Sequence, residues 1–403
     1  MKKNLLLFPV VLLFLIVFSE KAETIPAFAR KYRISCQTCH APAMPKLKPY
    51  GDDFAGAGFQ LQDYESPRYF VETGDDKLSL IRDFPLAVRM DGFITYNFSN
   101  EDKPDFAAPY LMKLLSGGNL SKHLSYYFYF YMDERGEVVG VEDAYLMYNN
   151  LFNVDLDIYL GQFQVSDPLF KRELRLTLED YRLYTAPVGM SEISLKYDKG
   201  VMITYGAPTG TDVIVEVVNG NGLNEANDFH VFDKDTYKSF VGRLSQNIGS
   251  VLRLGVFGYY GKEELVNFEV SNNSAITNEV LFVGPDATVT PGNKLEVNLQ
   301  YLIRTDSRVY LQPSSALPVT DIRTEGFLGE IIYSPQGDQS NWYTMGLYNY
   351  VNSDLEMANY HSATLHLGYL LRRNVRLAGE YTYQFTDADN AFSQVSLGFV
   401  SGF

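Results

Sequence analysis

The fold is decided by the stretch VRLAGEY at residues 375–381, in which the side chains alternate with a period of two. One set of alternate positions is apolar or small, while the other set carries Arg376 and Glu380. The same alternation returns in VDLDIYL at 154–160 and in LEVNLQY at 295–301. Period-two alternation is a strand signature, and its repetition between turn signals predicts a β-sandwich or a β-barrel.

The alternating pattern extends from about residue 85 to the end of the chain and divides into sixteen candidate strands. Membrane-crossing strands need about 9 to 11 residues, and barrels of the bacterial outer membrane contain an even number of them. We therefore predict an all-β, antiparallel outer-membrane barrel over 85–403, with a soluble periplasmic β-protein as the alternative. The candidate strands cover residues 85–98, 109–116, 124–132, 138–148, 154–164, 200–206, 212–219, 237–244, 251–260, 277–284, 294–304, 325–333, 342–350, 363–371, 375–384 and 393–403.

The connections between these strands differ in length. After even-numbered strands they are mostly short, as at 149–153, 207–211, 245–249 and 372–374. After odd-numbered strands they are often long, as at 165–199, 220–236, 261–276, 305–324 and 351–362. Outer-membrane barrels have short periplasmic turns and longer extracellular loops, so this contrast favours the membrane barrel.

Both ends of the chain indicate export to the outer membrane. Lys2 and Lys3 precede an apolar run over 5–18, which is the layout of a secretory signal peptide; we expect it to span 1–23, with an uncleaved anchor as the alternative. The C-terminal strand alternates and closes on Phe403, which resembles the assembly signal of bacterial outer-membrane proteins.

The composition excludes one class of partner. The formal net charge is -15, whereas a surface that binds phosphate backbones should be basic, so we exclude nucleic acid. Outer-membrane lipid is the surface that the barrel is expected to contact. The sequence shows no hydrolase triad, phosphate-binding loop or zinc-ligand spacing.

The stretch CQTCH at 36–40 matches the C-x-x-C-H motif of covalent c-type haem attachment. The thiols of Cys36 and Cys39 add to the two haem vinyl groups, and the adjacent His40 then lies under the ring as the proximal iron ligand. These are the only 2 cysteines of the chain, so no other thiol competes for the haem. The alternative is a redox-active or disulfide-bonded cysteine pair beside an unrelated histidine.

The sequence leaves the second axial ligand of the iron open. Met44 is the nearest candidate, but four residues span at most about 14 Å, and the Cys39 thioether already holds this stretch at one edge of the ring. The identity of this second ligand decides whether the haem is suited to electron transfer or to reactions with small molecules. The alternatives are an open sixth position or a ligand from farther along the chain, among Met90, His123, His361 and His366.

Two of these histidines are expected to point into the barrel. His123 shares a strand face with Ser125, and His366 shares one with Thr364, whereas the opposite faces are apolar. Polar side chains of a membrane barrel face its lumen. For both histidines, an ordinary polar role in the lumen is favoured over haem ligation.

The residues around the haem motif resemble the start of the fused cytochrome–porins. The matching stretches are IPAFARKY at 25–32, the motif itself, PKL at 45–47, PYG at 49–51, Phe54, and Gly58-Phe59, where Gly-Tyr is expected. Members of this family are outer-membrane proteins with an N-terminal monohaem segment and a barrel of about sixteen strands, and the best-known members are iron oxidases.

The resemblance implies a small, mainly helical haem plug over 24–84, placed in the barrel lumen or at its mouth. It implies electron transfer from an extracellular donor, typically ferrous iron, to a periplasmic carrier. Nothing in the sequence itself identifies iron as the donor. The alternatives are a haem enzyme with an open sixth position, such as a peroxidase, and a porin whose haem segment is chiefly a plug.

Two predicted outer loops carry further polar residues. The stretch 167–184 is highly charged and is expected either to fold inward and narrow the barrel or to cap it. In the other loop, carboxylates and one imidazole have the chemistry of a divalent-cation site, although loop acids are more often solvated. Those residues are Asp228, His230, Asp233 and Asp235.

Overall fold

The computed structural model describes residues 27–32, 34–40, 42–61, 70–71, 74, 77–78, 80–81, 84–98, 103–166, 169–170, 172–267, 274–313, 315, 317–385 and 392–403. The predicted signal peptide, 1–23, lies outside the described residues. Among the helices of the described part, none has the length and apolar character needed to cross a membrane.

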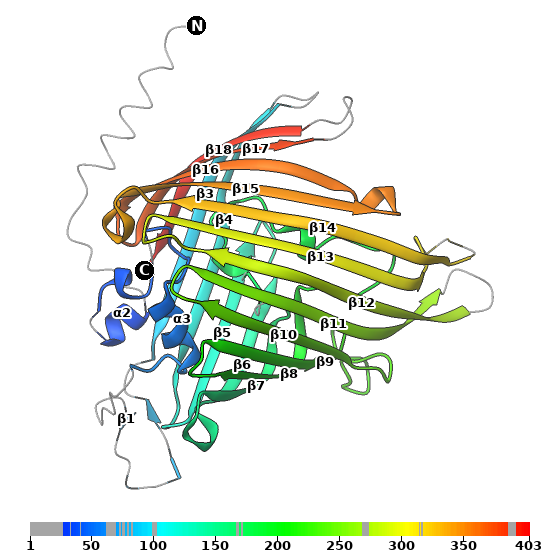
Figure 1. Cartoon of the computed structure of the whole chain (residues 1–403), viewed down its shortest axis with the longest axis horizontal. Coiled ribbons are helices and arrows are strands. Elements are labelled where there is room, and N and C mark those ends of the chain that lie inside the picture. Colours follow the sequence, from blue (N-terminus) through cyan, green and yellow to red (C-terminus); the bar gives the residue numbers. More distant parts are fainter. Residues whose placement is uncertain are drawn as a thin grey trace, which may run out of the picture.

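Sixteen antiparallel strands form one closed barrel, in which each strand pairs with its neighbours in sequence and β18 pairs with β3 (Figure 1). The predicted fold class is confirmed, and each predicted range overlaps one observed strand. The strands are β3 (Leu86–Asn97), β4 (Lys103–Asn119), β5 (Leu124–Glu134), β6 (Gly140–Tyr148), β7 (Leu156–Gln164), β8 (Tyr197–Gly206), β9 (Thr211–Val218), β10 (Ser239–Ile248), β11 (Leu252–Asn267), β12 (Ser274–Val289), β13 (Leu295–Val309), β14 (Val319–Tyr333), β15 (Trp342–Ser353), β16 (Tyr360–Arg372), β17 (Val375–Gln384) and β18 (Phe392–Gly402).

The outer face of the barrel is apolar. On β16, Leu365 and Leu367 are 61% and 51% exposed, whereas the intervening His366 is 2% exposed. Apolar side chains that face outward on a closed barrel are suited to lipid, because closure leaves no unpaired strand edge in the hydrocarbon. The period-two pattern of the sequence therefore separates a lipid-facing side from a lumen-facing side.

The lumen is packed with side chains. A buried apolar cluster joins inward residues of the strands, such as Phe257 and Leu328, to Leu183, Tyr184 and Ile193 from the connection between β7 and β8. Ion pairs lie beside this cluster, among them that between Arg243 and Asp286 and that between Arg304 and Asp306. The connection after β7 thus contributes to the interior of the barrel.

The two ends of the barrel differ, although less than predicted. The turns between β10 and β11 and between β16 and β17 are the shortest, and they lie at the end that we assign to the periplasm. Two connections at the other end are long, namely 165–196 and 219–238. The predicted long loops 261–276, 305–324 and 351–362 contain strand at both of their ends, because β11 to β16 extend beyond the predicted ranges.

The N-terminal segment and the C-terminus lie at the same end of the barrel (Figure 1). Val88 and Phe403 exchange two backbone hydrogen bonds, of 2.6 and 2.9 Å, which close the last strand on the first. The helices and the short strand pair before the barrel are α2 (Ala27–Tyr32), η1 (Cys36–Thr38), α3 (Pro49–Gly56), β1 (Phe70–Val71) and β2 (Leu80–Ile81). The short helices within the barrel connections are η3 (Leu151–Asn153), η4 (Arg172–Leu174), η5 (Arg182–Tyr184), η6 (Gly337–Gln339) and η7 (Glu356–Ala358).

The N-terminal segment has a small core of its own. Cys39, Phe54 and Phe59 are buried together, and the rings of Phe28 and Tyr32 pack against them. The Tyr32 hydroxyl donates a hydrogen bond to the carbonyl of Phe59, which ties α2 to the turn that follows α3. A core this small has little apolar surface with which to hold a large cofactor, so covalent tethering suits it.

Candidate functional site

The haem-motif residues lie on one tight turn. Ser35 caps η1 (Cys36–Thr38), since its Oγ accepts a hydrogen bond from the backbone N–H of Gln37 at 3.3 Å. The N–H of His40 donates to the carbonyl of Cys36 at 2.8 Å, which closes the turn. Both cysteines are free thiols. Two sulfur atoms and one imidazole therefore come from a single turn, as covalent haem attachment requires.

The ring of His40 is oriented by the chain that follows it. Its Nδ1 lies 2.9 Å from the carbonyl oxygen of Pro45 and 3.1 Å from that of Lys46. A proton on Nδ1 satisfies these carbonyls and leaves the Nε2 lone pair for a metal, the usual arrangement of a metal-binding histidine. Burial lowers the pKa of His40, against the opposing effect of these two hydrogen bonds, and the neutral ring is the form that binds a metal.

Helix α3 packs directly against the motif. A Cβ atom at Gly51 would lie 2.3 Å from the carbonyl oxygen of Cys39, so this close approach requires glycine. Burial raises the pKa of both the Cys36 and the Cys39 thiol, so the thiols are neutral. The PYG stretch of the sequence thus has a packing role, because its glycine admits the backbone that carries the cysteines.

A small, partly open hollow lies beside the motif, between the N-terminal segment and the turn after β16. The Nη1 atom of Arg373 is buried and has no hydrogen-bond partner among the described residues. An unpaired buried guanidinium nitrogen is costly, and a carboxylate is its best partner. Haem carries two propionate carboxylates, so the residues present fit a haem. The hollow is lined by Cys36, Gln37, His40, Pro42, Met44, Leu370 and Arg373.

Sequence reasoning missed Arg373. The available signal was a pair of arginines, Arg372 and Arg373, in the short turn between β16 and β17. The sequence by itself indicates only a periplasmic turn there. Only the tertiary structure shows that this turn lies next to the haem motif, since Arg373 lines the same hollow as Cys36 and His40.

Among the candidate methionines, the structure brings Met44 to the motif and places Met90 elsewhere. Met44 lines the hollow together with Cys36 and His40. Met90 lies between Arg89 and Asp91, which form an ion pair with each other on the lumen side of β3. Because side chains alternate along a strand, Met90 faces outward.

The candidate histidines lie outside the lining of the hollow. His366 faces the lumen as expected, with Nδ1 at 2.9 Å from a carboxylate oxygen of Glu380. His361 stacks on Phe385, with ring centroids 4.4 Å apart. The inward orientation expected for His123 is wrong: it lies in the turn before β5, and its ring stacks on Tyr148, an outward-facing residue of β6.

The N-terminal segment is tied to the barrel wall by several polar contacts. Lys46 Nζ lies 2.8 Å from Glu296 Oε1 and also pairs with Glu330, whose side chain is 2% exposed. Lys48 pairs with Asp338 of η6. The guanidinium of Arg376 donates to the backbone carbonyl of Met44. These contacts dock the segment on strands β13, β14 and β17 and on the turn after β14.

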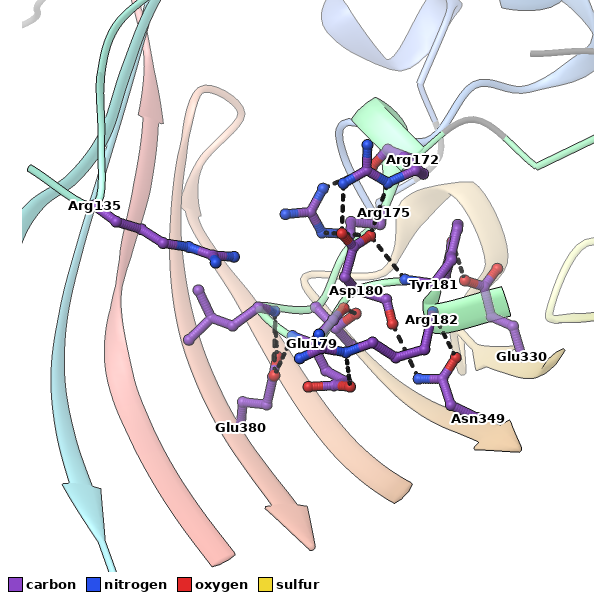
Figure 2. A network of polar contacts seen from close by, with 12 residues as sticks. Arg135, Arg172, Arg175, Glu179, Asp180, Tyr181, Arg182, Glu330, Asn349 and Glu380 are labelled. Carbon is purple, nitrogen blue, oxygen red and sulfur yellow. Dashed lines mark hydrogen bonds and ion pairs between the residues drawn. The ribbon is translucent and has the colours of Figure 1, made fainter. Parts of the chain in front are cut away.

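The connection after β7 folds into the barrel and contacts the same wall (Figure 2). Glu380 accepts hydrogen bonds from the backbone N–H groups of Leu178 and Glu179, at 2.9 and 3.0 Å. The hydroxyl of Tyr181 donates to Glu330 Oε2 at 2.6 Å. Of the two alternatives for 167–184, the described part supports inward folding. Glu330 joins this inner loop to the N-terminal segment, because it also binds Lys46.

The acidic outer loop does not form a metal site in the described residues. No group of three or more His, Cys, Asp or Glu side chains is arranged to hold an ion in that part of the chain. Asp233 pairs with Lys238, and Asp235 accepts the N–H groups of Tyr237 and Glu264, at 2.7 and 2.9 Å. These carboxylates shape the loop rather than gather around a cation.

No protein-family model and no curated protein matches this chain. Several solved structures align over most of it, among them these three. A loop-deletion mutant of OmpT, an outer-membrane protein of Vibrio cholerae, has a TM-score of 0.54 at 13% identity over 80% of this chain and 99% of its own. An anion-selective porin from Comamonas acidovorans has a TM-score of 0.53 at 11% identity, over 80% and 99%. OmpF of Salmonella typhi, in complex with daunomycin, has a TM-score of 0.52 at 11% identity, over 79% and 97%.

Identities this low show a shared fold. The closed barrel, its apolar outer face and these alignments agree on a single architecture. The chain has the porin-type β-barrel fold of bacterial outer-membrane proteins, with a helical segment docked at one end of the barrel.

Proposed function

We propose that this protein transfers electrons across the outer membrane by means of one covalently bound c-type haem. The donor is extracellular, with ferrous iron as the leading candidate, and the acceptor is a periplasmic carrier. The observation that carries the proposal is the single turn with Cys36, Cys39 and His40 beside a hollow that contains an unpaired arginine nitrogen. The resemblance to the fused cytochrome–porins supports the direction of transfer and the choice of donor.

Each residue of the site has a defined role in holding the group. Cys36 and Cys39 would tether the haem, and His40 would ligate its iron through Nε2. Arg373 would pair with a propionate, and Met44, which lines the same hollow, is a candidate for a second iron ligand. When bound, the haem supplies a one-electron redox couple.

The packed lumen favours electron transfer over diffusion of solutes. The inner loop binds the wall through Glu330 and Glu380, and its apolar side chains join the buried cluster of the barrel. A solute that crossed the barrel would have to displace this packing. An electron does not have to displace the packed side chains, because it can tunnel through them.

The first experiment is an optical and magnetic spectrum of the purified full-length protein. We expect one covalent haem per chain and a low-spin spectrum in both oxidation states, without binding of carbon monoxide. The double variant C36S/C39S should lose the covalent haem while keeping the barrel. A high-spin haem that binds carbon monoxide would overturn the proposal in favour of a peroxidase-like enzyme.

The second experiment tests the donor and the packed lumen. Stopped-flow mixing with ferrous iron should reduce the haem, and no reduction at any pH would remove iron as the donor. In planar bilayers the protein should conduct far less than an open porin. Conductance equal to that of an open porin would instead assign the haem segment the role of a plug.

A further inference from the structure

A row of aromatic rings begins at the haem motif. Cys39 is buried together with Phe54 and Phe59, so the cysteine that would carry one haem thioether lies in an aromatic cluster. The ring of Phe59 then stacks on Tyr127 of β5, with centroids 5.2 Å apart. The aromatic contact therefore passes from the N-terminal segment to the barrel wall.

The row continues along the lumen side of β5. The ring centroids of Tyr127 and Tyr129 are 6.3 Å apart, and those of Tyr129 and Tyr131 are 5.3 Å apart. Residues at i and i+2 share one face of a strand, and four residues of strand extend about 13 Å. The last ring is thus far from the haem motif and close to Glu134, where β5 ends.

These rings are held in place. Tyr129 and Tyr131 are 1% and 4% exposed. The ammonium of Lys113 lies 4.3 Å from the ring centroid of Tyr129 and 5.2 Å from that of Tyr131. The hydroxyl groups of Tyr129 and Tyr197 are hydrogen-bonded at 2.9 Å. The tyrosines of β5 are therefore more than a consequence of the tyrosine-rich composition, because each ring is fixed in contact with the next ring of the row.

Ring contacts also lead from Tyr127 to Tyr145 of β6 and on to Tyr159 of β7, with centroids 5.6 and 5.3 Å apart, but these run across the strands and not along β5 toward its outer end. The buried lumen positions of β14 are Ile322, Thr324, Leu328, Glu330 and Ile332, a mixture of aliphatic, hydroxyl and acidic side chains. On β14, packing of the lumen is therefore met without aromatic rings. On β5, three successive inward positions from Tyr127 to Tyr131 carry aromatic rings that continue the cluster at Cys39.

We propose that Phe59, Tyr127, Tyr129 and Tyr131 form the route by which an electron from the outer side reaches the group attached at Cys39. The route rests on the proposed function. It covers part of the distance that must be crossed, because a hydrocarbon core about 30 Å thick is too wide for one haem at the periplasmic end to span. Aromatic rings in contact mediate electron tunnelling better than saturated side chains, because their frontier orbitals lie closer in energy to the transferred electron.

The overall step moves one electron. A one-electron reductant on the outer side, such as ferrous iron, is oxidised by one charge unit, and the iron bound at the haem motif is reduced by one. The four rings mediate tunnelling and are unchanged at the end. No proton is taken up or released by the route, and no covalent bond forms or breaks.

The test is flash-induced electron injection into the full-length, haem-loaded protein. A photoactive ruthenium complex is attached to a cysteine introduced by Val138→Cys, a position that lies between β5 and β6 and is 74% exposed. The rate at which the flash reduces the haem is then followed optically. Tyr129→Leu breaks the row, Tyr129→Phe keeps the ring, and Phe257→Leu removes an equally buried ring that lies off the row. Tyr131→Leu removes the outermost ring of the row, and it replaces Tyr129→Leu in the experiment if that variant does not fold.

We expect Tyr129→Leu or Tyr131→Leu to slow injection by an order of magnitude or more, whereas Tyr129→Phe and Phe257→Leu leave it nearly unchanged. The near-ultraviolet circular dichroism of each variant, with and without haem, shows that the remaining tyrosines keep their packing. Equal rates in the wild type and in both leucine variants would overturn the route and leave the proposed function standing. If bulk dithionite reduces the wild-type haem but the flash does not, the proposed electron crossing itself is overturned.

Discussion

The ammonium group of Lys46 provides the sharpest test of how the N-terminal segment is docked. It lies between Glu296 and Glu330, and the Glu330 side chain is only 2% exposed. Burial acts to lower the pKa of Lys46, but the charges of Glu330 and Glu296 outweigh it and raise that pKa above its usual value. Lys46 is therefore charged wherever the barrel is folded.

The substitution Lys46→Met keeps the length of the side chain and removes its charge. The Glu330 carboxylate then stays buried with neutral donors, the Tyr181 hydroxyl at 2.6 Å and the Asn298 amide at 2.9 Å. Removing one partner of a buried pair costs about 3–5 kcal/mol. Even the lower value corresponds to a change of roughly a hundredfold in the docking equilibrium.

The assay is hydrogen–deuterium exchange of the full chain in detergent, read on peptides from 42–61. Undocking exposes these amides, so Lys46→Met should reduce their protection by roughly a hundredfold or more. Lys48→Met is the matched control: its partner Asp338 is 40% exposed, and such a pair contributes about 0–1 kcal/mol. Adding Glu330→Gln to Lys46→Met should restore most of the protection. Equal losses in the two single variants would refute the reasoning.

Three further outcomes follow from the site. Gly51→Ala should reduce the covalent haem per chain, measured by absorbance, because its Cβ would lie 2.3 Å from the Cys39 carbonyl oxygen; Gly56→Ala, with open space around it, should not. Arg373→Gln should move the midpoint potential of the haem to more negative values in a potentiometric titration, because it removes a positive charge that favours the reduced form. His366→Gln should leave the haem spectrum unchanged, since its ring lies outside the hollow; a changed spectrum would identify it as a ligand.

The barrel was predictable because half of each strand faces lipid. An apolar outer side against a mixed inner side is a contrast that the sequence displays directly, as on either side of His366. The prediction missed the ends of the strands, where the two sides of a strand no longer differ in polarity. Above the apolar band the outward positions are polar, as with Lys262 and Glu279, which pair across β11 and β12 at 2.6 Å. A strand that is polar on both sides looks like a loop.

The wrong expectation for His123 has a related cause. Alternation assigns a side only while the chain is extended, and β5 begins one residue later, at Leu124. The packed lumen was beyond sequence reasoning for a different reason. The inner loop meets Glu330 and Glu380 of strands far along the chain, and a charged loop does not reveal whether its partners are protein or water.

By itself, the sequence determined the barrel, its strand number and the haem motif, because each depends on neighbours close along the chain: alternate residues of a strand, or five residues of one turn. Only the tertiary structure decided what surrounds that turn. It placed Arg373 and Met44 at one hollow, fixed Lys46 between two carboxylates, and joined the Cys39 cluster to the tyrosines of β5. Those contacts link segments far apart in the chain, and they exist only because closing the barrel brings distant strands to one wall.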